Sequence, residues 1–161
     1  MDQITAANIM ARSEATLSPD LDIYRAIRQL LKSKLTGAPV VDDNGVLLGM
    51  LTERDCLKVL VGGVMEGLPA GNVSDYMSAP AESIKPTARL YDIVHLFLTR
   101  AYRKLPVVDD DARVIGQVSR RDALKSLESI RDDPRLDGTR DSQPPDGSGV
   151  DSAMKFARGR R

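Results

Sequence analysis

Two short strings in this 161-residue sequence combine side chains that can bind an anion or a sugar. Residues 49–55 read GMLTERD and residues 116–122 read GQVSRRD, so each apolar run ends in a hydroxyl residue with an aspartate three positions later. Where a strand runs into a helix, unpaired backbone N–H groups and the positive end of the helix dipole attract anions. An arginine directly before each aspartate adds charge-assisted contacts to phosphate. The strings therefore predict two anion-binding junctions.

The same spacing has a purely structural interpretation. Thr-x-x-Asp or Ser-x-x-Asp before a helix forms a capping box, in which the two side chains satisfy the first free N–H groups. Capping requires neither the arginine nor a second copy in register. The two interpretations predict different effects of Asp→Asn, on ligand affinity in one case and on stability in the other.

The two strings are parts of an internal repeat. A shift of 67 residues places the PVVDD of residues 39–43 on that of residues 106–110, without a gap. Comparison of residues 7–60 with residues 74–127 gives 15 identities in 54 positions, whereas chance gives roughly three or four. Each repeat is short for an independent domain, so we expect the two to bury their apolar faces together.

The sequence pattern of each repeat predicts a short first helix, which is followed by the element order β-α-β-β-α. In repeat 1, a helix at 5–10 precedes an extended piece at 15–17, a helix from residue 21 to Gly37, strands at 38–41 and 46–51, and a helix at 53–61. The corresponding segments of repeat 2 are 72–77, 82–84, 87–101, 105–108, 114–118 and 120–130. We assign repeat 1 to residues 3–62, a linker to 63–71 and repeat 2 to 72–130. Residues 131–161 have the polar composition of a disordered tail.

Composition excludes several classes of function. Lys plus Arg and Asp plus Glu both number 23, so the chain lacks the basic excess typical of nucleic-acid binding. Cys56 and His95 are single residues of their type, which argues against a disulfide, a Cys/His metal site and a catalytic triad. We expect Cys56 to be a small buried thiol and His95 to lie on the surface. No signal peptide or membrane span is recognisable, so we expect a cytoplasmic protein without a membrane partner.

Beyond these patterns, the sequence resembles the tandem CBS-domain family, named after cystathionine β-synthase. The resemblance rests on Ile9-Met10 and Tyr76-Met77, on the two PVVD segments, and on the two hydroxyl-x-x-Asp strings, and it covers residues 3–130. It implies an α/β module of two repeats with pseudo-twofold symmetry. It also implies two clefts for adenosine-containing ligands such as AMP, ADP, ATP, NAD or S-adenosylmethionine.

The resemblance assigns each cleft residues of both repeats. The first would use Thr5, Asn8, Met10, Thr36, Gly37 and Ala38 with Ser119, Arg121 and Asp122. The second would use Asp75, Met77, Tyr102, Arg103 and Lys104 with Thr52, Arg54 and Asp55. The aspartates would bind ribose hydroxyls, the hydroxyl residues and arginines phosphate, and the backbone before each proline the adenine edge. Arg103 and Lys104 would favour the more anionic ligand in the second cleft, against the opposing charge of Asp75.

The leading hypothesis is thus a non-catalytic regulatory module that binds an adenine nucleotide, without a catalytic cofactor, and signals by conformation or assembly. The alternative is a dimerisation module whose clefts stay empty. An enzyme is disfavoured because the sequence holds no nucleophile–base pair, metal cluster or glycine-rich nucleotide fingerprint. We expect a homodimer, since the last helix of each repeat has apolar positions beyond those the core needs. The ligand within this class, the occupancy of each cleft, the target protein and the role of the tail stay open.

Overall fold

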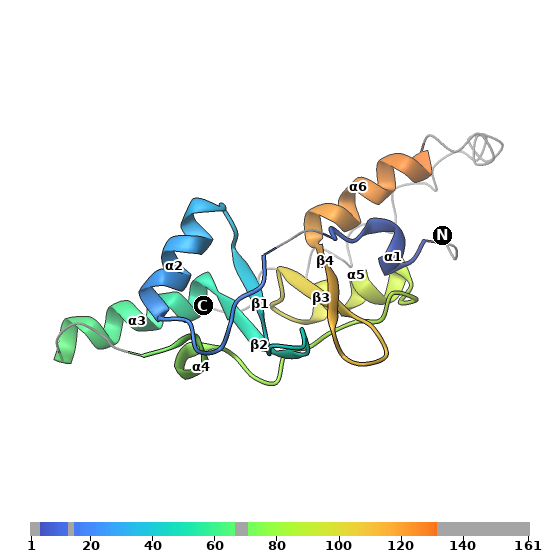
Figure 1. Cartoon of the computed structure of the whole chain (residues 1–161). Coiled ribbons are helices and arrows are strands. Elements are labelled where there is room, and N and C mark those ends of the chain that lie inside the picture. Colours follow the sequence, from blue (N-terminus) through green and yellow to red (C-terminus); the bar gives the residue numbers. More distant parts are fainter. Residues whose placement is uncertain (1–3, 13–14, 67–70, 132–161) are drawn as a thin grey trace, which may run out of the picture. The chain divides into compact units, whose positions relative to one another are not determined.

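The computed structural model describes residues 4–12, 15–66 and 71–131. Repeat 1 contains α1 (Ala6–Ile9), α2 (Ile23–Lys32), β1 (Gly37–Val41), β2 (Leu47–Thr52) and α3 (Glu53–Glu66). Repeat 2 contains α4 (Val73–Tyr76), α5 (Leu90–Thr99), β3 (Lys104–Val108), β4 (Val114–Ser119) and α6 (Arg120–Arg131) (Figure 1). The predicted α/β repeat is confirmed. The predicted tail, apart from Arg131, lies outside the described residues.

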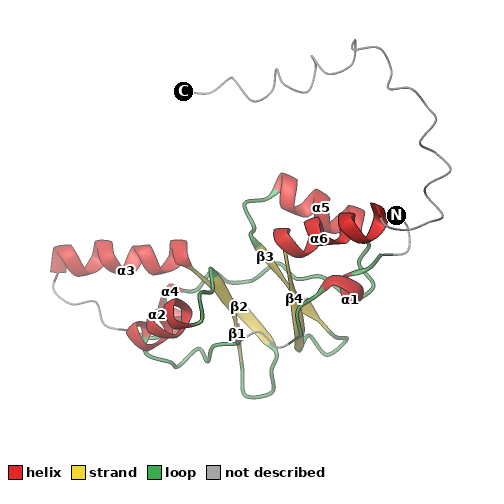
Figure 2. Cartoon of the chain, turned by 90° about the horizontal axis from the view of Figure 1, so that it is seen from above, coloured by secondary structure: helices red, strands yellow, loops and turns green. Residues whose placement is uncertain are grey.

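Each repeat forms one antiparallel hairpin that leads directly into its last helix (Figure 2). Gly37 pairs with Thr52 in the first hairpin, and Lys104 pairs with Ser119 in the second. Asp42 and Asp109 organise the two turns, because the Oδ1 atom of each accepts two backbone N–H bonds. The start of each proline-containing strand is therefore held beside the start of the last helix of the same repeat.

The two turns pair with each other in a reciprocal way. The N–H of Leu47 donates to the carbonyl of Ala112, and the N–H of Val114 donates to the carbonyl of Gly45, each at 3.0 Å. The two bonds are exchanged by the shift of 67 residues that relates the repeats. This reciprocity is the signature of the predicted pseudo-twofold symmetry.

The short first helix of each repeat packs on the other repeat. Ala6 and Ala7 of α1 donate to the carbonyls of Ala88 and Pro86 in repeat 2. Val73 and Ser74 of α4 donate to the carbonyls of Leu21 and Pro19 in repeat 1, and α4 contacts α2 and α3 (Figure 1). The repeats exchange these helices, so neither sequence repeat is a complete structural half.

Two glycines permit this exchange. A Cβ atom on Gly49 would lie 2.8 Å from the carbonyl oxygen of Ser78 and 2.9 Å from Met77 Sδ. The equivalent atom on Gly116 would lie 2.9 Å from both the Ala11 carbonyl oxygen and Met10 Sδ. Real Cβ atoms do not approach neighbours so closely, and only glycine lets the segment after each short helix reach the strand.

The described apolar cluster of repeat 1 shows how the halves are completed. It combines buried side chains of α2, β1, β2 and α3 with Val73 of α4, and Tyr76 and Met77 pack against it. Val73 is fully buried. The expected burial of the repeats against each other is thus achieved in this cluster by the exchanged helix.

The structure corrects four of the predicted segments. The extended pieces predicted at 15–17 and 82–84 are reduced to parallel bridges at Leu17 and Ile84. Each is followed two residues later by a proline, which has no N–H to continue a ladder. Helix α5 begins at Leu90 rather than at residue 87, and α3 continues to Glu66 through the first part of the predicted linker. Residues 67–70 of that linker lie outside the described residues.

Candidate functional site

The two predicted anion-binding strings lie where a strand runs into a helix. Thr52 ends β2 before α3 begins at Glu53, and Ser119 ends β4 before α6 begins at Arg120. Asp55 and Asp122 stand in the first turn of their helices, where a negative charge is stabilised by the helix dipole. Arg54 and Arg121 are exposed, so both guanidinium groups are accessible.

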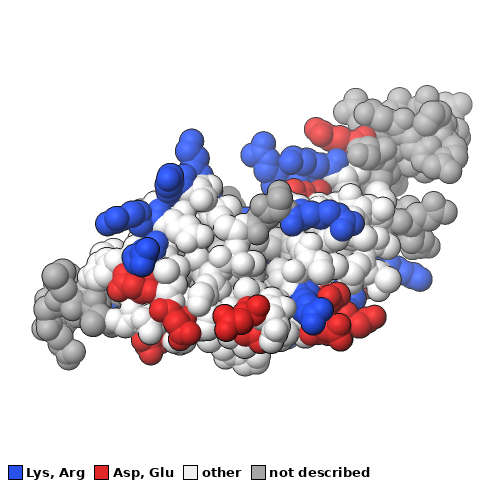
Figure 3. All heavy atoms as spheres, viewed as in Figure 1, with Lys and Arg blue, Asp and Glu red and all other residues white. Residues whose placement is uncertain are grey.

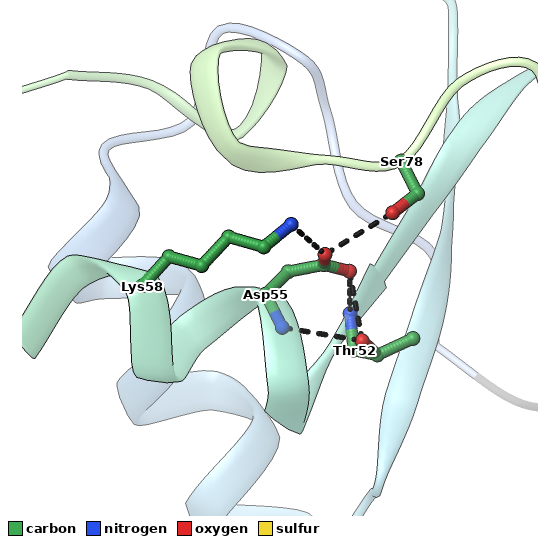
Figure 4. Close-up of polar contacts among 4 residues, drawn as sticks. All are labelled: Thr52, Asp55, Lys58 and Ser78. Atoms are coloured by element: carbon green, nitrogen blue, oxygen red, sulfur yellow. Dashed lines mark hydrogen bonds and ion pairs between the residues drawn. The ribbon is translucent and has the colours of Figure 1, made fainter.

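The Asp55 carboxylate is buried and holds four internal contacts (Figure 4). Its Oδ2 atom accepts from the N–H of Thr52 at 3.0 Å and from the Thr52 hydroxyl at 2.8 Å. Its Oδ1 atom accepts from Lys58 Nζ at 3.0 Å and from the Ser78 hydroxyl at 3.1 Å. Two carboxylate oxygens offer about four acceptor positions. All of them are therefore used inside the protein.

These contacts determine the protonation state of Asp55. Burial raises the pKa of the carboxyl, but the hydrogen bonds from Lys58, Thr52 and Ser78 outweigh it, so that the net pKa lies below the ordinary value. Burial and the charges of Asp55 and Glu53 raise the pKa of the neighbouring Cys56 thiol. The thiol form is thus favoured over the nucleophilic thiolate. Cys56 is half-buried against the core, as the expected packing role requires.

The Asp122 carboxylate accepts only half as many internal hydrogen bonds as the Asp55 carboxylate. Its Oδ2 atom accepts from the N–H of Ser119 at 2.9 Å and from the Ser119 hydroxyl at 2.6 Å. Its Oδ1 atom has Lys125 Nζ at 3.9 Å, which is beyond hydrogen-bond distance. The side chain of Asp122 is 20% exposed, whereas that of Asp55 is 3% exposed. The capping interpretation therefore holds at both junctions, but of the two carboxylates only that of Asp122 keeps an oxygen atom to which no described residue donates a hydrogen bond.

The exchanged helices bring part of each predicted set together. Met77 packs against Gly49, and the backbones of Ser78 and Met50 exchange two hydrogen bonds. In the other half Met10 packs against Gly116, and Ala11 and Gln117 exchange two equivalent bonds. Met77 and Met10 are thus placed on the strands that lead to Thr52 and Ser119. This mixing of repeats is the arrangement that the resemblance implied.

The other predicted residues of the short helices have contacts of their own. Thr5 donates to Asn8 Oδ1 from both its N–H and its hydroxyl at 2.8 Å, and Asp75 Oδ2 accepts from the N–H of Asn72 at 2.8 Å. Thr5, Asn8 and Asp75 thus take part in helix capping, a role that would have to coexist with ligand contacts.

The segments before the two prolines lie beside the junction of their own repeat. The N–H of Glu53 donates to the carbonyl of Thr36, and Gly37 and Ala38 are buried in β1 opposite Thr52 and Leu51. The N–H of Arg120 donates to the carbonyl of Arg103. Arg103 also reaches the other repeat, with its Nη1 atom 3.8 Å from Glu53 Oε2. This ion pair brings the Arg103 side chain to the opposite junction, while Tyr102 is half-buried and the backbone of Lys104 pairs with that of Ser119.

Sequence reasoning missed three polar residues that distinguish the junctions. Lys58 stands three positions after Asp55, a spacing that places both on one helix face and could have been recognised. Ser78 comes from the exchanged segment, and its contact to Asp55 depends on a tertiary arrangement. Gln117 is 2% exposed, and its Oε1 atom has no hydrogen-bond partner among the residues that the structure describes.

The described surface carries charged side chains of both signs. In Figure 3 most Lys and Arg lie along the upper edge and most Asp and Glu along the lower edge, with some of the opposite sign at each, and His95 is exposed as expected. Among residues 4–12, 15–66 and 71–131, no helix is long and apolar enough to cross a bilayer. The same residues hold no group of three or more His, Cys, Asp and Glu side chains that could bind a metal ion.

Comparison with known proteins identifies both repeats. The family model described as CBS domain matches residues 6–62 and again residues 73–129. The chain is 31% identical over 121 residues to the uncharacterized protein MJ1225 of Methanocaldococcus jannaschii, with 75% of this chain and 42% of the relative covered. It is 29% identical over 120 residues to inosine-5'-monophosphate dehydrogenase of the same organism, where the match covers 74% and 23% of the two chains. The chain thus spans less than half the length of these curated relatives.

Solved structures have the same fold. The structure of CBSX2 in complex with AMP is 27% identical in sequence to this chain and superposes with a TM-score of 0.71. The match covers 79% of this chain and 98% of that one. Another structure of CBSX2, described as a CBS-pair protein from Arabidopsis thaliana, is 26% identical with a TM-score of 0.69 and coverages of 79% of this chain and 96% of that one.

Proposed function

The chain belongs to the CBS-domain family, and we propose that it is a regulatory CBS pair that binds adenosine-containing ligands. The observation that carries this proposal is the open Asp122 carboxylate beside Ser119 and Arg121, at a junction where backbone N–H groups and a helix dipole favour anions. A carboxylate oxygen accepts ribose hydroxyls, and the arginine pairs with phosphate. The likeness to CBSX2, which was solved with AMP, supports the same ligand class.

The protein acts without chemistry of its own in this proposal, and no catalytic cofactor is required. AMP, ADP, ATP, NAD and S-adenosylmethionine share the adenosine group that the two residue sets would recognise. Binding would stabilise one arrangement of the exchanged helices, and a target protein would respond to the change in conformation or assembly. A purely structural role is favoured at one junction only, where the Asp55 carboxylate is satisfied internally.

Calorimetric titration of the full chain tests the ligand class. We expect at least one of these five ligands to bind saturably with a dissociation constant below about 100 µM. GMP serves as the control, since it has the same ribose and phosphate but a different base. The proposal is wrong if none of the five binds.

We further propose a homodimer formed through α3 and α6. Both helices expose leucines at equivalent positions: Leu57 is 58% and Leu60 64% exposed in α3, and Leu124 is 65% and Leu127 47% exposed in α6. Monomeric proteins rarely expose large contiguous apolar patches. The double variant Leu60→Glu/Leu127→Glu should therefore convert the dimer to a monomer in light scattering, while Thr87→Glu at an exposed turn should not. A wild-type monomer at a concentration of about 50 µM would contradict this assignment, because an interface of ordinary affinity would be formed there.

A further inference from the structure

One of the differences between the exchanged segments bears directly on the two carboxylates. Ser78 follows α4 and donates to Asp55 Oδ1 at 3.1 Å. The residue at the equivalent place after α1 is Ala11, 67 positions earlier, which has no hydroxyl. The backbones of the two residues are held alike, since Ser78 exchanges hydrogen bonds with Met50 and Ala11 exchanges them with Gln117 at 2.9–3.0 Å. The absence of a side-chain donor at residue 11 explains why the Oδ1 atom of Asp122 lacks the contact that Asp55 has.

The lysines reinforce the difference. Lys58 Nζ lies 3.0 Å from Asp55 Oδ1, whereas Lys125 Nζ lies 3.9 Å from Asp122 Oδ1. A ribose hydroxyl that approached Asp55 would have to displace both Ser78 and Lys58 from the same oxygen. A hydroxyl that approached Asp122 finds an oxygen without a hydrogen-bond donor among the described residues.

A second, independent difference lies on the strands. Gln117 is 2% exposed. In the part of the chain that the structure describes, its Oε1 atom is buried and has no hydrogen-bond partner. Because side chains two apart on a strand share a face, Gln117 lies on the face of β4 that carries Ser119. Buried acceptors are normally paired. Repeat 1 has Met50 in this place, whose thioether is a weak acceptor at best.

We infer that the Asp122 half is the ligand-bearing half of the pair and that Asp55 is closed by Ser78 and Lys58. In the Asp122 half, Asp122 Oδ1 accepts a ribose hydroxyl, and Gln117 Oε1 accepts the exocyclic amino group of adenine. With its Oε1 atom facing the base, Gln117 then favours a base with an amino group over a base with a carbonyl at that place. This inference rests on the proposed function, and it adds which half binds and which residue recognises the base.

Titration of the full chain with AMP, and with IMP as the analogue that lacks the amino group, tests the assignment. We expect about one AMP per chain and at least fivefold weaker binding of IMP, because the Gln117 acceptor would face a carbonyl. Ala11→Ser places a hydroxyl against Asp122 Oδ1 and should weaken AMP about tenfold, whereas Ser78→Ala should retain the wild-type affinity. Gln117→Met, the residue of repeat 1, should remove the preference for AMP over IMP. Thermal unfolding verifies that each variant is folded.

The possible failures are distinguishable. Three outcomes would each overturn this inference while the proposed function stands. The first is two equivalent AMP sites, and the second is a loss of AMP binding in Ser78→Ala without a loss in Ala11→Ser. The third is a preference for AMP over IMP that survives in Gln117→Met. A wild type that binds none of the adenosine-containing ligands would overturn the proposed function itself.

Discussion

Replacement of Asp55 by asparagine is expected to lower the free energy of unfolding by about 2 kcal/mol, because charge-assisted hydrogen bonds to a buried carboxylate are replaced by weaker neutral ones. Four donors from Thr52, Lys58 and Ser78 face the two carboxylate oxygens. An amide has a single oxygen, so its NH₂ group must face two of these donors. Lys58 adds little to the loss, since its side chain is 60% exposed and can turn into solvent. The expected decrease in Tm is roughly 5–10 °C in a thermal unfolding experiment.

The pH dependence of this difference identifies its cause. The pKa of Asp55 is lowered in the folded protein, so its carboxylate stabilises the fold at pH values above the pKa of the unfolded chain, which is about 3.9. This contribution is lost as the pH falls through the lower pKa of the folded state. The difference in unfolding free energy between wild type and Asp55→Asn should therefore be constant from about pH 5 to 8 and decrease below about pH 4. A difference that persists at acid pH would indicate packing rather than charge.

Asp122→Asn is the matched control for stability. The amide oxygen can keep both contacts to Ser119, while the NH₂ group takes the Oδ1 position, where no described donor lies within hydrogen-bond distance. The expected cost is below about 1 kcal/mol, from the lost charge at the helix N-terminus. Equal destabilisation of the two variants would mean that Ser78 and Lys58 do not contribute to the stability of the fold.

The repeat made most of the fold predictable from sequence. The shift of 67 residues defined two hairpins and the helices around them, and the turn residues at 43–45 marked the first hairpin correctly. The extended pieces at 15–17 and 82–84 were predicted as short strands, but in each only one residue forms a bridge to another strand. The local apolar pattern does not reveal how many residues pair. The end of α3 was predicted too early, since Gly62 and Gly63 have low helix propensity but are included in the helix.

The exchange of α1 and α4 could not be derived from periodicity. A four-residue helix is too short to show which repeat it packs on, and its position depends on the close approach that Gly49 and Gly116 permit. The two glycines were visible in the repeated strings, but their role required the structure. The mixing of repeats at each junction was accessible only through the family resemblance, and the tertiary contacts of Met77 and Met10 agree with it.

The asymmetry of the junctions shows where repeat-based reasoning ends. In the sequence, Asp55 and Asp122 are equivalent, since each has a hydroxyl residue three positions before it and a lysine three positions after it. The contact from Ser78 spans 23 residues and has no local signature. Capping and ligand binding, posed as alternatives for both aspartates, are thus better assigned separately: capping is observed at each, and a ligand role is proposed at Asp122.

Asp122→Asn is expected to weaken AMP binding by tenfold or more, which corresponds to the ~1.5–3 kcal/mol of a hydrogen bond to a charged group. In our proposal Asp122 Oδ1 accepts a ribose hydroxyl, and the variant presents either an amide NH₂ group there or a neutral oxygen. Asp92→Asn, at an exposed position of α5, removes the same charge away from the junction and should leave the affinity unchanged.

Calorimetry of both variants with AMP, and with 2'-deoxy-AMP and 3'-deoxy-AMP on the wild type, makes the test specific. If ribose hydroxyls bind Asp122, one deoxy analogue should reproduce the loss on the wild type and bind Asp122→Asn with little further change. Additive losses would show that the hydroxyl and the carboxylate do not interact, and the site would then have to be placed elsewhere.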